Sequence, residues 1–261
     1  MPRVTEIGSR DNALLVRLRK LAAQPDAYRK LGSVWIEGEH LCRAWLERRG
    51  GDGVQAVVAA TAWSDGAVRQ LLGRAESVAV LPEALMRRQS RLEAPAPYAL
   101  AVPWPGAGAL RPQAPTIVLD RLQDAGNVGT VLRSAAAFGF TQVVALRGTA
   151  ALWSPKVMRA GMGAHLALHV VESVEEAALD ALAVPLLATS SHATVEIHEA
   201  ALPWPCAWLM GSEGQGLSAS LLERCRQTLR IPQPGGEESL NVAVAASVCM
   251  YESSRRRLLS V

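Results

Sequence analysis

Apolar residues recur along the chain in two patterns: short continuous runs, and longer stretches in which they return every three or four positions. Continuous runs are typical of buried strands, and the longer repeat is typical of helices with one apolar face. The two patterns alternate from end to end, which predicts an α/β protein.

The N-terminal part contains the elements of a complete small domain. Apolar residues at helical spacing predict a helix over 14–22, with Ser9 and Asp11 as potential caps. A second helix is expected over 39–49, where two glycines end it. Strands are expected over four further stretches, 33–36, 54–60, 77–81 and 98–102.

A segment rich in proline and glycine follows this part. Six prolines and two glycines fall between residues 94 and 115, a composition typical of a linker. The sequence therefore predicts a first domain over 1–105, a linker over 106–115 and a second domain over 116–261.

The second part has the pattern of a parallel sheet. The run TIVLD at 116–120 is continuously apolar up to its last residue, as strands covered on both faces are. Helices are expected over 126–138 and near 174–182. Further strands are expected over 142–146, 185–189, 206–210 and 228–231. The final helix, 240–256, begins apolar nearly all round, so its own domain or another subunit must cover it.

Composition excludes several classes of protein. Apolar residues make up 49% and charged residues 20%, which excludes wholesale disorder. The longest apolar stretch, 240–251, is shorter than the roughly 18 residues of a membrane span, so no membrane partner is predicted. The N-terminus shows no apolar signal-peptide region, and we predict a cytoplasmic location.

The cysteines and histidines do not suggest a metal site. The four cysteines form no C-x-x-C pair, which argues against zinc knuckles and a disulfide framework. We expect reduced, mostly buried thiols. The five histidines show no ligand spacing either, so no metal is predicted.

Positive charge is concentrated near the N-terminus. The first 50 residues hold ten Lys and Arg against six Asp and Glu, whereas the rest is nearly balanced. Because phosphate contacts dominate RNA affinity, the best candidates for RNA docking are Arg17, Arg19, Lys20, Arg29 and Lys30. Lys156 and Arg159, on a short helix capped by Ser154, form a second candidate. A merely solvated face is the alternative for both sets.

Three segments of the second part place polar residues and glycines after predicted strands, where open α/β sheets bind ligands. They are 120–139 (DRLQDAGNVGTVLRSAAAFG), 210–218 (MGSEGQGLS) and 231–245 (IPQPGGEESLNVAVA). The glycine spacing G-x-x-G-x-G in the second is not the dinucleotide fingerprint, and no Walker lysine or G-x-S-x-G elbow is present.

Together the three segments resemble the signature of the TrmH/SpoU branch of the SPOUT superfamily of RNA methyltransferases. The first contains Asn-x-Gly-x-x-x-Arg, the second Gly-x-Glu-x-x-Gly-Leu, and the third Ile-Pro followed by Ser-Leu-Asn-Val. The matching residues are Asn127, Gly129, Arg133, Gly211, Glu213, Gly216, Leu217, Ile231, Pro232, Ser239, Leu240, Asn241 and Val242. The N-terminal part is similar to the family's L30e-like RNA-binding domain, from Ser9 and Asn12 through Arg29 to residues 35–38.

The resemblance implies a fold and an activity. The fold would be a small L30e-like α/β/α domain followed by a SPOUT parallel-sheet domain with a C-terminal trefoil knot. Members bind S-adenosylmethionine in the knot and methylate the ribose 2′-hydroxyl of structured RNA as homodimers, which pair through the catalytic domain. Ribosomal RNA is favoured over transfer RNA, because a separate L30e-like domain is commoner among the ribosomal enzymes.

The resemblance also implies roles for single residues. Backbone around Gly211, Ile231 and Leu240, with Thr189 at a preceding strand end, would bind the cofactor. The catalytic set would be Arg133, Asn127, Glu213, Ser239 and Asn241. A guanidinium is by default no base, so we expect Arg133 to bind the RNA phosphate and lower the pKa of the ribose hydroxyl. Asn127 and Ser239 would orient that hydroxyl, Glu213 would hold Asn127 or Arg133, and Asn241 would fix the loop.

Other functions stay open on sequence alone. An RNA-binding ribosome assembly factor could keep this fold without catalysis, although the complete set of five polar residues argues against decay. A tRNA 2′-O-methyltransferase is a second alternative. An NAD-type oxidoreductase is a third, but it lacks the fingerprint and the ribose-binding acid.

Overall fold

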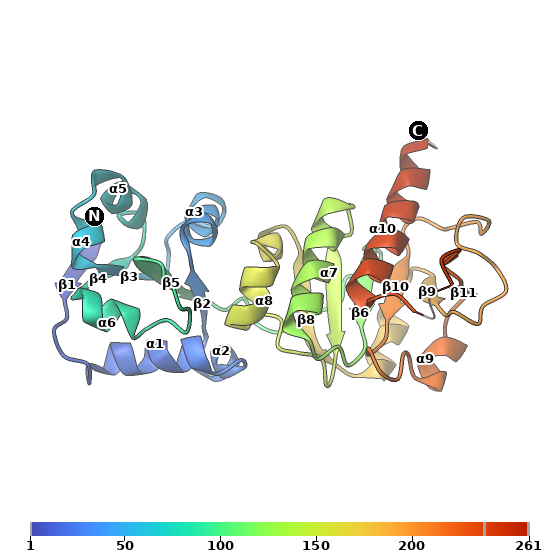
Figure 1. Cartoon of the computed structure of the whole chain (residues 1–261), viewed down its shortest axis with the longest axis horizontal. Coiled ribbons are helices and arrows are strands. Elements are labelled where there is room, and N and C mark those ends of the chain that lie inside the picture. The colour runs from blue at the N-terminus through green and yellow to red at the C-terminus, as the bar shows by residue number, and fades with distance from the viewer. Residues whose placement is uncertain (1, 237–238, 260–261) are drawn as a thin grey trace. The chain divides into compact units, whose positions relative to one another are not determined.

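The computed structural model describes residues 2–236 and 239–259, and the chain divides into two compact units (Figure 1). Met1–Gly106 with Trp153–Leu166 forms the first unit, and Ala107–Leu152 with Ala167–Val261 forms the second. The division after residue 106 falls at the start of the predicted linker. Residues 153–166, however, group with the first unit and not with the second.

The first unit is built on a five-stranded mixed sheet in the order β1-β4-β3-β5-β2. Its strands are β1 (Arg3–Glu6), β2 (Ser33–Glu37), β3 (Gln55–Ala59), β4 (Ser77–Leu81) and β5 (Tyr98–Pro103). β5 runs antiparallel to both of its neighbours, whereas β1, β4 and β3 are parallel.

Helices cover both faces of this sheet. The helices of this unit are α1 (Ala13–Ala23), α2 (Ala27–Leu31), α3 (Glu39–Arg48), α4 (Ala60–Trp63), α5 (Gly66–Leu72), α6 (Glu83–Arg87), α8 (Pro155–Ala160) and the short η1 (Ala164–Leu166). Figure 1 shows α3, α4 and α5 on one side and α1 and α6 on the other. The expected α/β/α layering is therefore confirmed.

The second unit is built on a six-stranded sheet in the order β11-β9-β10-β6-β7-β8, and every pairing in it is parallel. Its strands are β6 (Thr116–Leu119), β7 (Gln142–Leu146), β8 (His169–Val174), β9 (Leu186–Thr189), β10 (Ala207–Met210) and β11 (Gln227–Leu229). The expected parallel sheet is confirmed. The four residues of β6 and of β10 are all buried, which explains why these strands read as continuous apolar runs.

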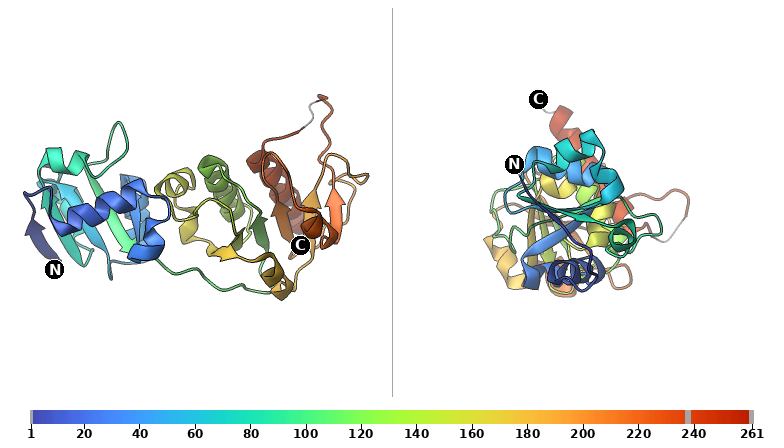
Figure 2. Two further views of the ribbon diagram at one scale, coloured as in Figure 1. Left: turned by 90° about the horizontal axis from the view of Figure 1, so that it is seen from below. Right: turned by 90° about the vertical axis from the view of Figure 1, so that its left-hand side faces the viewer.

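Helices cover this sheet on both faces as well (Figure 2). They are α7 (Ala125–Ala137), η2 (Glu176–Ala181), α9 (Ala219–Glu223) and α10 (Val242–Leu259). Leu179 of η2 and Leu221 of α9 join a buried cluster with Val118, Val144 and Leu209. On the opposite face α10 packs against α7 and β10, and the indole of Trp208 donates a 2.9 Å hydrogen bond to Ser253.

Several expected elements were wrong in detail. Asn12, and not Ser9 or Asp11, caps α1, because its side chain accepts from the backbone N–H of Leu14 at 2.9 Å. The helix expected near 174–182 is the 3₁₀ turn η2, and Val174 belongs to the unpredicted strand β8. The apolar pattern does not predict β8 because Glu172 and Ser173 interrupt its apolar run. Glu172 is nevertheless buried, since it accepts from the N–H of Leu152 at 2.8 Å.

Short and exposed elements were also missed. All four residues of β1 are exposed, so no apolar pattern marks this edge strand. Helices α2, α4 and α6 have five residues or fewer, which is too short for a helical repeat to show.

The four cysteines are unpaired, as expected, and three are buried, whereas Cys225 is half-buried. Burial raises the pKa of Cys206 to about 12, so this thiol stays protonated at neutral pH. No helix within residues 2–236 and 239–259 has the length and hydropathy needed to cross a membrane.

The last helix is not covered on every side by its own unit. Ala243, Ala246 and Met250 are buried, but Val244 and Tyr251 are 49% and 53% exposed. Its own domain therefore covers only one face of this helix, and the other face is exposed.

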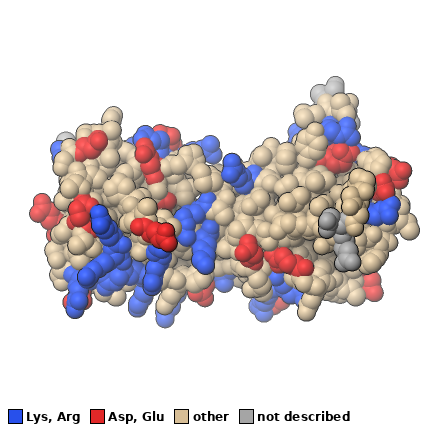
Figure 3. Space-filling view, viewed as in Figure 1, with Lys and Arg blue, Asp and Glu red and all other residues tan. Residues whose placement is uncertain are grey.

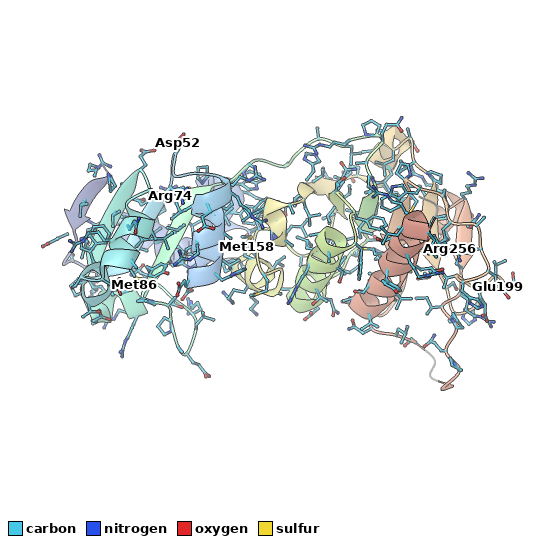
Figure 4. The ribbon with its side chains drawn as sticks, turned by 90° about the horizontal axis from the view of Figure 1, so that it is seen from above. Asp52, Arg74, Met86, Met158, Glu199 and Arg256 are labelled. Atoms are coloured by element: carbon cyan, nitrogen blue, oxygen red, sulfur yellow. The ribbon has the colours of Figure 1, made fainter. Side chains whose placement is uncertain are left out.

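Arg256, labelled in Figure 4, attaches α10 to the segment that follows β9. The guanidinium of Arg256 donates to the carbonyls of Ile197 and His198 at 2.9 and 2.8 Å. Glu252 in turn accepts two 2.9 Å bonds from Arg255 and one 2.7 Å bond from Arg256. Because Glu252 is buried, these bonds fix the guanidinium that reaches the neighbouring segment.

The ion pairs of Glu252 predict a loss of stability in acid. Hydrogen bonds from Arg255 and then Arg256 outweigh burial and lower its pKa from 4.5 to about 2. A lowered folded-state pKa adds stability that is complete above 4.5 and is lost as the pH falls towards 2. We expect Glu252→Gln to lower the melting temperature at pH 7, with a difference from wild type that shrinks across this interval. Equal melting temperatures at pH 7 in calorimetric scans would contradict this role.

Candidate active site

The parallel sheet brings the three polar segments to one edge. β6 ends at Leu119 and leads into 120–139, β10 ends at Met210 and leads into 210–218, and β11 ends at Leu229 before 231–245. Because β6, β10, β9 and β11 are neighbours in the order of the sheet, their carboxyl ends lie together. Open parallel sheets bind ligands at this edge.

A chain of hydrogen bonds joins one residue from each segment. The side-chain amide of Asn127 donates to Oε1 of Glu213 at 2.9 Å. The amide of Asn241 donates to Oδ1 of Asn127 at 3.0 Å. Glu213 thus contacts Asn127 and not Arg133, and Asn127 uses both ends of its amide, one for each of the other two segments.

Helix capping fixes the two asparagines. Asp124 begins α7 by accepting from the backbone N–H of Asn127 at 2.7 Å. Asn241 begins α10, since its Oδ1 accepts from the N–H of Ala243 at 2.9 Å and of Val244 at 3.3 Å. Side-chain caps of this kind contribute about 1 kcal/mol each. Both asparagines are therefore held by the starts of the helices that carry them.

A cavity of about 410 Å³ lies beside this chain of hydrogen bonds. All four residues expected to bind a cofactor line it, namely Thr189, Gly211, Ile231 and Leu240. Glu213, Ser239 and Asn241 line it too. Leu209 and Leu217 add apolar wall, while Ser190 adds a hydroxyl. A cavity whose wall combines apolar side chains with polar groups is suited to a small organic ligand of the size of a nucleoside.

Glycine is required at the base of the cavity. A Cβ on Gly211 would lie 2.2 Å from the carbonyl carbon of Gly216 and 2.3 Å from the nitrogen of Leu217. The two ends of the loop 211–217 therefore meet backbone to backbone.

Arg133 is not brought into this arrangement. It lies on α7 six residues after Asn127, about 240° further round the helix at 100° per residue. It is exposed, and it is not among the residues that line the cavity. Within residues 2–236 and 239–259 its guanidinium makes no ion pair. The expectation that Asn127 and Arg133 face one site from neighbouring turns is thus not met within this chain.

Comparison with known families decides what the second unit is. A model of the SpoU rRNA Methylase family matches residues 114–251, which is more than half of the chain. The chain belongs to this family.

Relatives cover nearly the whole chain or about half of it. An uncharacterized tRNA/rRNA methyltransferase of Synechocystis is 32% identical over 97% of this chain and 95% of its own length. The 23S rRNA (guanosine-2′-O-)-methyltransferase RlmB of Bordetella pertussis is 37% identical over 54% of this chain and 59% of its own. The crystal structure of an AdoMet-bound rRNA methyltransferase from Sinorhizobium meliloti is 25% identical, covers 98% of both chains and has a TM-score of 0.82. The resemblance to TrmH/SpoU enzymes is thereby confirmed.

One further residue at this edge of the sheet, Arg121, was not predicted from the sequence. Arg121 follows β6 with a φ of 56°, in the left-handed region that favours glycine. Its Nε and Nη2 donate to the two carboxylate oxygens of Asp120, each at 2.9 Å, and its Nη1 lies 3.4 Å from Oε1 of Gln215. Asp120 raises the pKa of Arg121 through these bonds. Only the backbone angle marks this residue, and a sequence does not show it.

The basic residues expected to dock RNA all lie in the first unit. Figure 3 shows Lys and Arg side chains gathered on the face where α1 and α6 lie. Lys20 and Lys30 are exposed, and the guanidinium of Arg29 stacks on the ring of Tyr28 at 5.5 Å.

Two of these arginines also make bonds inside the unit. Arg17 donates from Nη2 to the carbonyl of Leu31 at 3.2 Å and to the hydroxyl of Ser33, which joins α1 to β2. Arg19 donates to the carbonyl of Arg10 at 3.0 Å. Their charge stays at the surface, but their donors are partly used.

The second basic set lies on a short helix of the first unit. Ser154 caps α8 by accepting from Val157 at 3.4 Å, in agreement with the expected capping. Lys156 is exposed and Arg159 is half-buried. The described part of the chain holds no group of three or more His, Cys, Asp or Glu side chains placed to bind a metal ion.

The close approach at Gly211 predicts a sharp difference between two glycines of one loop. Overpacking costs about 1–3 kcal/mol, and each kcal/mol lowers the melting temperature of a chain of this size by about 2–4 °C. We expect Gly211→Ala to lower the melting temperature accordingly. Gly214→Ala is the matched control, because a Cβ there meets nothing within 4 Å. Equal effects of the two substitutions would contradict the packing argument.

Proposed function

We propose that the chain transfers a methyl group from S-adenosylmethionine to a ribose 2′-hydroxyl of structured RNA, ribosomal RNA in particular. The observation that carries this proposal is the chain of hydrogen bonds Glu213–Asn127–Asn241 along the wall of the 410 Å³ cavity. Relatives named as 23S rRNA 2′-O-methyltransferases support the acceptor, and the AdoMet-bound structural relative supports the donor.

The cavity fits S-adenosylmethionine. Pockets for ligands of this size measure roughly 300–1,000 Å³. Leu209, Leu217 and Ile231 would hold the adenine between apolar side chains, and the glycine loop would offer backbone groups to its ring nitrogens. Thr189 and Leu240 would bind at the sides. When bound, S-adenosylmethionine supplies a methyl group on a positively charged sulfur.

The residues of the chain supply position and charge. Near-attack alignment lowers the activation barrier by on the order of 7–11 kcal/mol. The main contribution of the residues would therefore be to hold the two reactants in a fixed arrangement. Ser239, which lines the cavity, and Asn127 would orient the ribose hydroxyl, while Glu213 and Asn241 keep Asn127 in place. Arg133 would bind the phosphate next to that ribose and favour the anionic form of the hydroxyl.

We further propose that the chain has the trefoil knot of SPOUT proteins. β11 lies at the edge of the sheet, yet α10 returns to pack on α7 and β10 near its middle. Arg256 of α10 also donates to carbonyls of the segment that leaves β9. These contacts support a path in which the last helix is wrapped by an earlier loop.

The proposal includes a homodimer formed through the catalytic domain. The exposed apolar side chains of α10, among them Val244 and Tyr251, support it, because a second copy would supply the missing cover. We also propose an L30e-like RNA-binding domain over 1–105, joined by the linker 106–115 to the methyltransferase domain over 116–261. The four unpaired cysteines support a cytoplasmic location.

Calorimetry tests the choice of cofactor. The wild-type protein is expected to bind S-adenosylmethionine with 1:1 stoichiometry and to give no heat with NAD. A catalytically inactive RNA-binding protein would show neither heat nor methyl transfer. Binding of NAD alone would contradict the proposed function.

A conservative substitution tests Arg133. Arg133→Lys keeps the charge but loses the planar fork that binds phosphate with two parallel hydrogen bonds. We expect kcat for methyl transfer to rRNA to fall by about 100-fold, corresponding to roughly 2.7 kcal/mol, while the Kd for S-adenosylmethionine stays unchanged. Arg226→Lys, an exposed arginine just before β11 at the amino edge of the sheet, is the matched control. Near-normal turnover of Arg133→Lys would refute the bidentate role.

A further inference from the structure

We propose that Arg121 and Gln215 form a second phosphate-binding point for the acceptor RNA, separate from Arg133. This inference rests on the proposed function, since it assigns part of the same RNA substrate to the same sheet edge. Both residues follow strands that end at this edge, β6 and β10, which are direct neighbours.

Arg121 is held in a conformation that only its surroundings explain. Its φ of 56° costs an L-residue other than glycine about 1–2 kcal/mol. The N–H of Arg121 donates to the hydroxyl of Thr149 at 3.1 Å, and Gly148 leaves room for the side chain, since a Cβ there would lie 3.2 Å from Cγ of Arg121. Strain of this kind is concentrated at functional sites.

The guanidinium is oriented before any ligand arrives. Asp120, whose side chain is 6% exposed, accepts from Nε and Nη2 of Arg121 in a bidentate pair, while the arginine side chain is 39% exposed. The pair fixes the plane of the guanidinium and leaves Nη1 at its outer end. A fixed donor loses little entropy when it binds, which favours recognition of an anion.

Gln215 adds a neutral donor beside this charge. Its Oε1 faces Nη1 of Arg121 at 3.4 Å, a distance at which the bond is weak and easily exchanged. The Nε2 amide of Gln215 makes no hydrogen bond within residues 2–236 and 239–259. Two donors, one charged and one neutral, therefore stand together without a strong acceptor, and a phosphate oxygen would satisfy both.

Carboxylates close by set a limit on this site. The negative charge of Glu176 acts on Arg121 and would repel a phosphate, although Glu176 also pairs with Arg224 at 3.9 Å. Arg121 also neutralises Asp120, so its loss could weaken RNA binding by exposing a negative charge without any direct contact. The test has to separate these two roles.

The experiment compares Arg121→Gly with Asp120→Asn/Arg121→Gly, using 23S rRNA purified from a strain that lacks the protein. Glycine adopts a φ of 56° without strain, so both variants are expected to fold, which circular dichroism and melting temperature check. We expect Arg121→Gly to raise the KM for rRNA about tenfold, with kcat and the Kd for S-adenosylmethionine within twofold of wild type. The salt dependence of rRNA retention on filters should fall by about one charge.

The double variant decides between contact and neutralisation. A phosphate contact leaves its KM as high as that of Arg121→Gly, whereas recovery towards wild type would overturn the proposal in favour of neutralisation. Gln215→Ala should raise the KM about threefold, and Arg226→Gly, at the opposite edge of the sheet, should leave it unchanged. A weakened Kd for S-adenosylmethionine in Arg121→Gly would instead assign Arg121 to the cofactor loop and overturn the phosphate role.

The proposed function fails in a different way. If the wild-type protein binds no S-adenosylmethionine, the methyltransferase proposal is lost. If it binds the donor while Arg121→Gly keeps the rRNA KM and the salt dependence of wild type, only the second phosphate-binding point is lost.

Discussion

The side-chain amide of Asn127 is the interaction on which the rest of the site depends. Its nitrogen donates to Glu213 and its oxygen accepts from Asn241, residues that lie 86 and 114 positions away along the chain. An amide has both a donor and an acceptor, so one side chain can bridge a carboxylate and a second amide. An aspartate at this position would place two carboxylates together, and an apolar residue would leave Glu213 and Asn241 without each other's support.

The fold makes this bridge possible because the sheet and helix α10 hold both asparagines in position. Parallel strands deliver the three segments to one edge, and α10 holds Asn241 there only because it is fixed along its length. Trp208 bonds Ser253 on the sheet side, while Arg256, oriented by the buried Glu252, bonds the segment after β9. Distant residues of α10 thus determine where its first turn lies, and the cavity wall formed by Leu240 and Ala245 follows from the same placement.

Local patterns in the sequence predicted most strands, the parallel sheet and the segments that form the site, because buried strands and glycine loops leave a direct trace in residue type. The pattern failed where structure depends on context. β8 contains Glu172, a buried carboxylate that accepts from the backbone N–H of Leu152, and β1 is an exposed edge strand. The partners of Asn127 are distant in the sequence and become neighbours only in the folded chain. The position of Arg121 depends on a backbone angle that no residue pattern marks. The rotation of Arg133 away from Asn127 follows from their separation of six residues on α7, about 240° at 100° per residue.

The contact between α7 and α10 has a consequence for how a ligand enters. Small residues let the two helices approach closely, and Ser134 and Ser247 share a 2.8 Å hydrogen bond beyond their first turns. The helices are therefore joined both at this point and at their starts, through Asn127 and Asn241. These two links resist separation of the helices. We therefore expect a ligand to enter the cavity by displacing the glycine loop 211–217, which Glu213 links to Asn127 of α7 and Gln215 links to Arg121.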